Sequence, residues 1–221
     1  DVCLHSEGKN MSSMLFFLYF CLPNNVIKSM EQTKWSETVI LADAGYVDAV
    51  VFNLTVNFER MLNRPIPRAD LAQWLVCVAL DGGVEPGDND IQAVLVHKKD
   101  KKALDNFIPS DFSSELDGKA FNDGKLGEFR ISSVQIENLV DADELFVQSL
   151  EALADAKEIK RLIVIPDMEI YGARVREVLG RTEGKDVTLL AMEPQAGRGF
   201  RQDILGYSLM SALGIRGEEF K

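Results

Sequence analysis

The chain has 221 residues, of which 46% are hydrophobic and 27% are charged, and its formal net charge at pH 7 is −11. This length suits one well-packed domain of ordinary globular composition. The acidic excess excludes nonspecific attraction to phosphate backbones, so contact with nucleic acid would need a local basic patch or metal ions.

Residues 1–29 differ in character from the rest of the chain. Their apolar run, MLFFLYFCL at 14–22, is too short to cross a bilayer and lacks the basic segment and cleavage site of a signal peptide. A polar stretch then begins at Met30 and leads into the first expected strand. We expect residues 1–29 to be a non-native or disordered extension, residues 30–221 to form a single domain, and the protein to bind no membrane.

The cysteines indicate the compartment. Cys3, Cys21 and Cys77 form no CxxC pair, and the two histidines add no metal-ligand spacing. A zinc site and a disulfide framework are therefore not expected. Such a pattern is typical of the reducing cytoplasm, where we expect the protein to lie.

The first predicted strand is the apolar run TVILAD at 38–43, which ends on Asp43. Apolar residues at helical spacing over 47–62 then predict a helix. The prolines at 65 and 67 end it, because proline is not tolerated inside a helix.

A second amphipathic helix starts at Leu71, with Trp74 and Leu75 on its apolar face. Two further strands are predicted at 91–98 and 128–136, and a long polar connection separates them. Connections of that length tend to be functional or mobile.

The second half of the chain alternates between helices and strands. A helix over 141–156 carries acids in its first turn, and the strand RLIVIPD follows at 161–167. A helix over 169–179, a strand over 186–192 and a last helix over roughly 200–213 complete the chain. This alternation, with strands that are apolar throughout, predicts a parallel sheet covered on both faces. We expect an α/β fold: a three-layer, doubly wound sandwich with a five-stranded, mostly parallel sheet in the order 3-2-1-4-5.

Acidic residues gather where the predicted strands end. Asp43 closes the first strand and Asp167 the fourth, and Glu169 lies two residues further on. Asp141 opens the helix after the third strand. Because the carboxyl ends of parallel strands share one edge of the sheet, we expect these four acids to lie close together.

Two interpretations of these acids remain open. Clustered carboxylates repel one another unless a cation neutralises them, and their oxygens suit Mg²⁺ or Mn²⁺, which would activate water for phosphodiester cleavage. Each acid taken alone is also an ordinary helix N-cap or first-turn residue.

The order of these segments resembles the PIN-like NYN domains over residues 38–214. The resemblance rests on ILAD followed by a helix, NLVDADELFVQSLEAL, LIVIPDME, DVTLLAM and FRQDILGYSLMSALGI. It implies a PIN-like fold and a metal-dependent nuclease, usually one that acts on RNA.

By the same resemblance Asp43 stands at the position of the family's first-strand aspartate, and Asp141 at that of the acid opening its third-strand helix. Asp167 and Glu169 take the place of the paired-acid motif. Asp203 matches, more loosely, an acid of the last helix. The implied catalytic and metal-binding residues are Asp43, Asp141, Asp167 and Glu169, with Mg²⁺ or Mn²⁺ as the cofactor.

The sequence departs from the family motif at several positions. Ile165 and Pro166 replace a Ser or Thr and a Gly, and Tyr46 replaces an Asn. A second acid expected in the third-strand helix falls near Val147 and Gln148. These departures favour a degenerate domain that binds a partner, a nucleotide or RNA without cleaving it; the alternative is a Mg²⁺- or Mn²⁺-dependent endoribonuclease.

Basic residues offer two interpretations as well. The run HKKDKK at 97–102, with Arg174, Arg176, Arg198 and Arg201, would supply local positive charge for RNA. The commoner meaning of such residues is a solvated surface.

Overall fold

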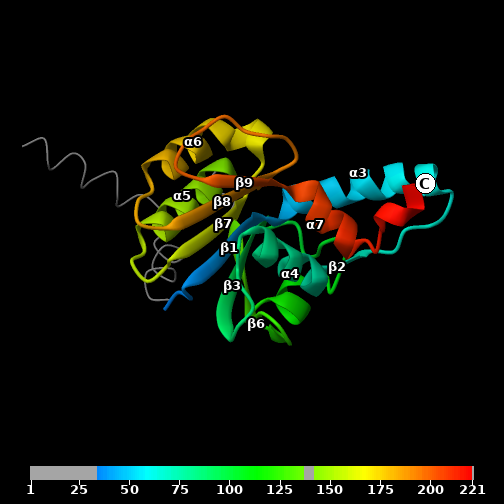
Figure 1. Ribbon diagram of the computed structural model, residues 1–221, viewed down its shortest axis with the longest axis horizontal. Helices are drawn as coiled ribbons and strands as arrows, with labels where there is room; N and C mark the ends of the chain where they lie inside the picture. Colours follow the sequence, from blue (N-terminus) through cyan, green and yellow to red (C-terminus); the bar gives the residue numbers. More distant parts are fainter. Residues whose placement is uncertain (1–33, 137–141, 221) are drawn as a thin grey trace, which may run out of the picture. The chain divides into compact units, whose positions relative to one another are not determined.

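A mostly parallel β-sheet with helices on both faces dominates the protein (Figure 1). The structure is a computed structural model that describes residues 34–136 and 142–220. The expected extension at 1–29 and Asp141 both lie outside the described residues. From Trp35 onward the chain forms one compact unit.

Strands and helices succeed one another along this unit, with no α-helix between residues 89 and 136 or between 186 and 204. The strands are β1 (Thr38–Asp43), β2 (Ala69–Asp70), β3 (Asn89–Lys98), β4 (Phe107–Ile108), β5 (Ala120–Asp123), β6 (Gly127–Ile136), β7 (Arg161–Ile165), β8 (Asp186–Ala191) and β9 (Arg201–Ile204). The α-helices are α3 (Ala44–Leu62), α4 (Leu71–Asp81), α5 (Ala142–Asp155), α6 (Met168–Arg181) and α7 (Leu205–Ala212), with a π-helical turn η1 (Phe112–Leu116) and a 3₁₀ turn η2 (Gly217–Phe220).

Within the described residues the main sheet has seven strands, in the order β5-β6-β3-β1-β7-β8-β9. Neighbouring strands are parallel except β5, which is antiparallel to β6. The expectation of five strands was therefore wrong, because β5 and β9 extend the sheet at its two edges. The five expected strands are the central ones, and β1 lies between β3 and β7.

The last helix expected at 200–213 is likewise shorter than predicted. Arg201–Ile204 forms β9, which pairs with β8, and α7 begins only at Leu205. Arg201, Gln202 and Asp203 are exposed, so this edge strand has no apolar alternation in its sequence. Its pairing depends on backbone hydrogen bonds to β8, which leave no pattern in the side chains.

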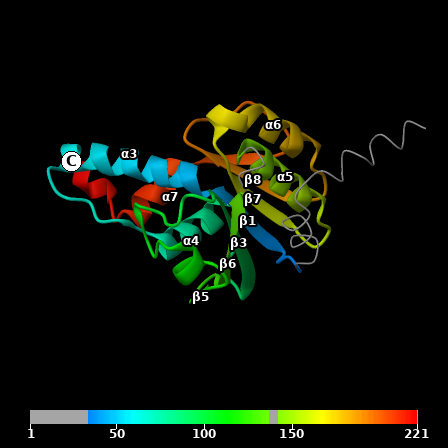
Figure 2. The ribbon, with the colours of Figure 1, turned by 180° about the vertical axis from the view of Figure 1, so that it is seen from behind.

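Two groups of helices cover the sheet. Figures 1 and 2 show α5 and α6 on one face and α3, α4 and α7 on the other. Ile40 and Ala42 of β1 pack into the core on the α3, α4 and α7 side. Val39 and Leu41, which alternate with them, are also fully buried. The central strands are thus buried on both faces, as their continuous apolar sequences predicted.

Helix α4 confirms the expected burial of its apolar face. Trp74 is 1% exposed and Leu75 is fully buried. The Trp74 ring packs against Phe107 of β4 at a centroid distance of 5.6 Å. The helical spacing of the apolar residues was therefore sufficient to identify the inward face.

Candidate functional site: the acidic edge of the sheet

Asp43 lies at the carboxyl end of β1, in the middle of the sheet. Its neighbour Ala42 pairs with Ile165 of β7, and Asp43 itself pairs with Val96 of β3. Its side chain caps helix α3, because Oδ1 accepts a hydrogen bond from the backbone N–H of Tyr46 at 2.9 Å. The acid therefore ends a strand and begins a helix at once.

Asp167 occupies the equivalent place after β7. Its Oδ1 accepts hydrogen bonds from the backbone N–H groups of Glu169 at 3.0 Å and Ile170 at 3.3 Å, and thereby caps α6. Since β1 and β7 are neighbouring parallel strands, the two capping acids stand on one edge of the sheet.

The side chain of Tyr171 joins these two ends. Its hydroxyl donates a hydrogen bond to Oδ2 of Asp43 at 2.5 Å and accepts one from the backbone N–H of Asp167 at 3.1 Å. The residue is only 3% exposed, and its ring stacks on Phe146 of α5. Its backbone (φ −126°, ψ 18°) departs from helical values, so α6 is kinked there.

Sequence reasoning missed Tyr171. A tyrosine in the first turns of a helix carries no periodic signal, and its partner Asp43 lies 128 residues away. The one available clue is its position four residues after a capping aspartate.

Burial and nearby negative charges raise the pKa values of Asp43 and Tyr46 at this edge. Burial raises the pKa of the Asp43 carboxyl, and the charge of Asp167 adds to the rise, although hydrogen bonds from Tyr171 and Tyr46 oppose it. Burial, followed by the charges of nearby acids, raises the pKa of the Tyr46 hydroxyl to about 12. Those acids are Asp167, Glu169, Asp43 and Glu193. The edge therefore carries a negative potential, to which Glu193, after β8, also contributes.

The remaining sequence-predicted residues have different positions. Glu169 is exposed in the first turn of α6 and contributes to the negative potential at Tyr46. Asp141 lies outside the described residues. Asp203, expected in the last helix, lies instead in β9, where its charge acts with burial to raise the pKa of Asp81 to about 6.

The described acids form no ready-made site for a divalent cation. Mg²⁺ and Mn²⁺ need several oxygen ligands directed at one point. Both oxygens of Asp43 already accept hydrogen bonds, one from Tyr46 and one from Tyr171. Among the residues whose side chains the structure describes, no three His, Cys, Asp or Glu side chains gather in a way that would hold a metal ion.

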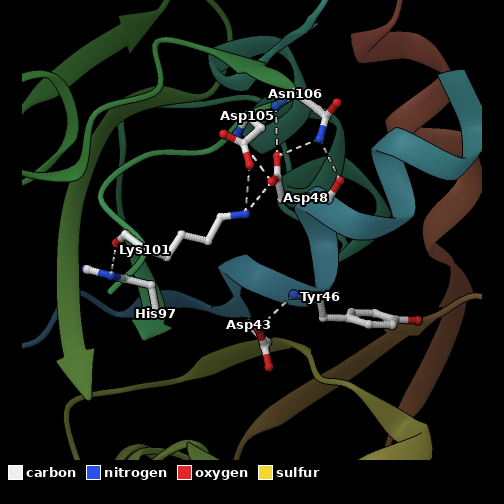
Figure 3. Close-up of polar contacts among 7 residues, drawn as sticks. All are labelled: Asp43, Tyr46, Asp48, His97, Lys101, Asp105 and Asn106. Carbon is white, nitrogen blue, oxygen red and sulfur yellow. Dashed lines mark hydrogen bonds and ion pairs between the residues drawn. The ribbon is translucent and has the colours of Figure 1, made fainter. Parts of the chain in front are cut away.

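A second polar cluster adjoins the acidic edge on helix α3 (Figure 3). Asp48 is 2% exposed, and its carboxylate accepts hydrogen bonds from Lys101 Nζ at 2.6 Å and from the backbone N–H groups of Asp105 at 3.2 Å and Asn106 at 2.9 Å. His97 holds the start of the same segment, because its Nδ1–H donates to the backbone oxygen of Lys101 at 3.2 Å. The cluster fixes residues 101–106 onto α3.

Several basic residues that were candidates for RNA contact are engaged with carboxylates. Lys101 pairs with Asp48, and Arg174 of α6 pairs with Glu144 of α5 at 2.7 Å. Arg201 pairs with Asp186 at 2.9 Å. These pairs serve contacts within the protein and do not form a free basic patch.

No helix in the described part of the chain is both long and apolar enough to cross a membrane.

Comparisons with known proteins place the domain in a family. No curated protein and no solved structure matches the chain. Residues 32–220 match the family described as "Family of unknown function (DUF6621)". That match covers most of the chain, which therefore belongs to the DUF6621 family.

Proposed function

We propose that this chain is a degenerate PIN-like domain of the NYN type, which binds a partner protein through its acidic sheet edge and does not cleave RNA. The central strand order β6-β3-β1-β7-β8 supports this layout, because it follows the 3-2-1-4-5 order of the resemblance. Ligands of such sheets bind where the strand order reverses, which here is the edge that holds Asp43 and Asp167.

The proposal that the chain does not cleave RNA rests on the hydrogen bonds of Asp43. A metal-dependent nuclease needs this carboxylate to turn an oxygen toward a cation. Here Oδ1 serves the cap of α3 and Oδ2 accepts the hydroxyl of Tyr171. The tyrosine thus supplies the positive end of a dipole where a nuclease would need the metal.

The charge of the edge favours a basic ligand. The acids around Tyr46 repel phosphate groups and attract lysine and arginine side chains. Lys101 and Arg174 are already paired with Asp48 and Glu144, so their charges are balanced within the protein. A Lys- or Arg-containing segment of a protein therefore suits the edge better than RNA or a nucleotide does.

The alternative function is a Mg²⁺- or Mn²⁺-dependent endoribonuclease. The placement of Asp43 and Asp167 on neighbouring strand ends favours it, and Asp141 and Glu169 would complete the ligand set. In this function a metal ion would share the Asp43 carboxylate with the Tyr171 hydroxyl or replace that hydroxyl, and the chain would cleave RNA only with added metal.

A cleavage assay separates the two functions. The full chain is incubated with end-labelled single-stranded RNA and Mg²⁺ or Mn²⁺. We expect no cleavage above that of the Asp43→Asn variant. Metal-dependent cleavage that disappears in Asp43→Asn would establish the nuclease instead.

A binding assay tests the proposed ligand. Fluorescence anisotropy compares a labelled Lys/Arg-rich peptide with a single-stranded RNA of similar length. Replacing Glu169 and Glu193 by Gln should weaken peptide binding by roughly three- to tenfold, the effect of removing two exposed charges. The matched control replaces the exposed Glu85 and Glu183 by Gln and should leave binding unchanged. Tighter binding of RNA than of peptide would contradict the proposal.

A further inference from the structure

Strand β5 forms one edge of the main sheet, beyond β6 (Figure 2). It pairs with β6 on one side, and no other described strand covers its outer side. Such an edge presents unpaired backbone N–H and C=O groups, to which a strand of another chain can add. We propose that β5 pairs antiparallel with β5 of a second copy of this chain, across a twofold axis at Phe121.

The backbone of β5 directs its hydrogen-bonding groups to either side at alternate residues. The backbone oxygen of Lys119 accepts a hydrogen bond from the N–H of Ile131 in β6 at 2.8 Å. In an antiparallel ladder, residues bonded to one neighbour alternate with residues whose N–H and C=O point the other way. The backbone groups of Phe121 are therefore directed at β6, and those of Ala120 and Asn122 point out from the sheet. Both of these outward residues are exposed.

The charges of β5 and its flanks are self-complementary about Phe121. In antiparallel pairing centred on Phe121, Ala120 lies opposite Asn122 of the second copy, and this aligns their outward backbone groups. Lys119 then lies opposite Asp123 of the second copy, because the two residues flank Phe121 at equal spacing. The twofold axis repeats this contact, so two pairs of opposite charge form across the strands.

The nearest registers that use the same backbone groups bring like charges together. Moving the centre by one residue toward the C-terminus would bring Lys119 toward Lys125 of the second copy. Moving it by one residue toward the N-terminus would bring Asp117 toward Asp123. Like charges directly opposite each other destabilise a strand pair. The register centred on Phe121 is therefore the favoured one.

The side chains of the strand suit this register. Phe121 is half-buried, and its ring stacks on Phe129 of β6 at a centroid distance of 4.8 Å. On the axis it faces its own copy at a position without backbone hydrogen bonds, where opposite side chains lie closest. Lys119 is exposed, and Asp123 binds the backbone of the following turn through Oδ1, which leaves Oδ2 for the lysine.

The opposite edge of the sheet is engaged within its own chain. Arg201 of β9 pairs with Asp186 at 2.9 Å. The side-chain amide of Gln202 bonds to the backbone N–H and oxygen of Gln195 at 2.7 and 3.1 Å. Lys119, by contrast, forms no ion pair with a described residue. Of the two edges, β5 is thus the one whose charged side chains are available to a second copy.

Sedimentation velocity of the full chain tests the dimer. A pair of such short strands buries little surface, so the concentration runs from about 10 to about 500 µM. We expect the wild type to dimerise over this range. Lys119→Glu sets acid opposite acid twice and should weaken the dimer by at least about tenfold.

The matched control is Lys157→Glu, which makes the same charge change at an exposed residue after α5 and should dimerise like the wild type. A wild type that stays monomeric over the whole range would overturn the proposal. So would equal dimerisation of Lys119→Glu and the wild type.

Asn122→Pro tests the backbone contact. Proline removes the outward N–H and leaves the hydrogen bonds to β6 in place, since edge strands accept proline where the N–H faces outward. The dimer should weaken by at least about tenfold, because the N–H is lost from both copies. Unchanged dimerisation would show that the strands do not pair in this register.

Hydrogen exchange locates the contact. At the concentration where the wild type is dimeric, the amides of Ala120 and Asn122 should exchange at least about threefold more slowly than in dilute protein. The amide of Phe121, which faces β6, should not change. Self-association without slower exchange at Ala120 and Asn122 would show that the copies meet at another surface.

Discussion

The Nζ atom of Lys101 lies 2.6 Å from Oδ2 of Asp48, whose side chain is only 3% exposed. The two residues are 53 positions apart, and the pair joins the segment after β3 to helix α3. Burial lowers the pKa of Lys101, but the hydrogen bond and charge of Asp48 raise it overall. A buried carboxylate with this many donors holds its segment in one position.

Asp48→Ala should therefore destabilise the domain by about 3 kcal/mol, because it leaves the N–H groups of Asp105 and Asn106 and the ammonium group of Lys101 without their shared acceptor. Lys101→Met should cost less, since the two N–H donors still reach Asp48. Urea unfolding of both variants measures the difference. A cost below about 1 kcal/mol for Asp48→Ala would show that residues 101–106 hold their position without it.

Asp81 should make stability depend on pH. Burial, and then the charge of Asp203, raise its folded-state pKa to about 6 from a usual value of 3.8. Between these two values the folded protein binds more protons than the unfolded chain does, so the unfolding free energy falls as pH rises. The melting temperature of the wild type should therefore fall between pH 4 and pH 6, and in Asp81→Asn this fall should be smaller.

The control for the pH experiment is Asp88→Asn, which removes an exposed acid from the loop before β3. Asp203→Asn should lower the pKa of Asp81, and an NMR titration of the Asp81 carboxyl carbon measures this directly. Identical pH profiles for Asp81→Asn, Asp88→Asn and the wild type would contradict the assignment.

Trp74→Ala should cost about 3–5 kcal/mol in unfolding free energy, because it removes a buried ring and leaves a cavity beside Phe107. Trp74→Phe should cost much less. It keeps most of the ring and removes an indole N–H that has no hydrogen-bond partner among the described residues. Chemical denaturation of both variants tests this ranking. The control is Phe52→Ala, because Phe52 is 55% exposed and its loss should change the unfolding free energy by close to zero.

Two substitutions of Asp167 should distinguish the effect of its helix cap on stability from the effect of its charge. Asparagine also caps helices, so Asp167→Asn keeps the hydrogen bonds to Glu169 and Ile170 and removes the repulsion of Asp43. Its melting temperature should equal or exceed that of the wild type. Asp167→Ala loses the cap and should cost about 1 kcal/mol. If both variants lose stability equally, the carboxylate charge itself stabilises α6.

The sequence alone determined the central architecture of this protein. The strands around Ile40 and Ile163 are apolar without interruption, and the helix of Trp74 has one apolar stripe, so local periodicity indicated both the element types and the faces they bury. It also placed Asp43 and Asp167 at strand ends, because an acid that follows a buried strand marks its boundary.

Only the tertiary structure decided what those acids contact. Strand β9 is polar and lies at an edge, so its pairing left no pattern in its side chains. The bonds from Tyr171 to Asp43 and from Lys101 to Asp48 join residues 128 and 53 positions apart. Such contacts depend on how helices pack on the sheet and on which rotamers that packing allows, and neither property repeats along the chain.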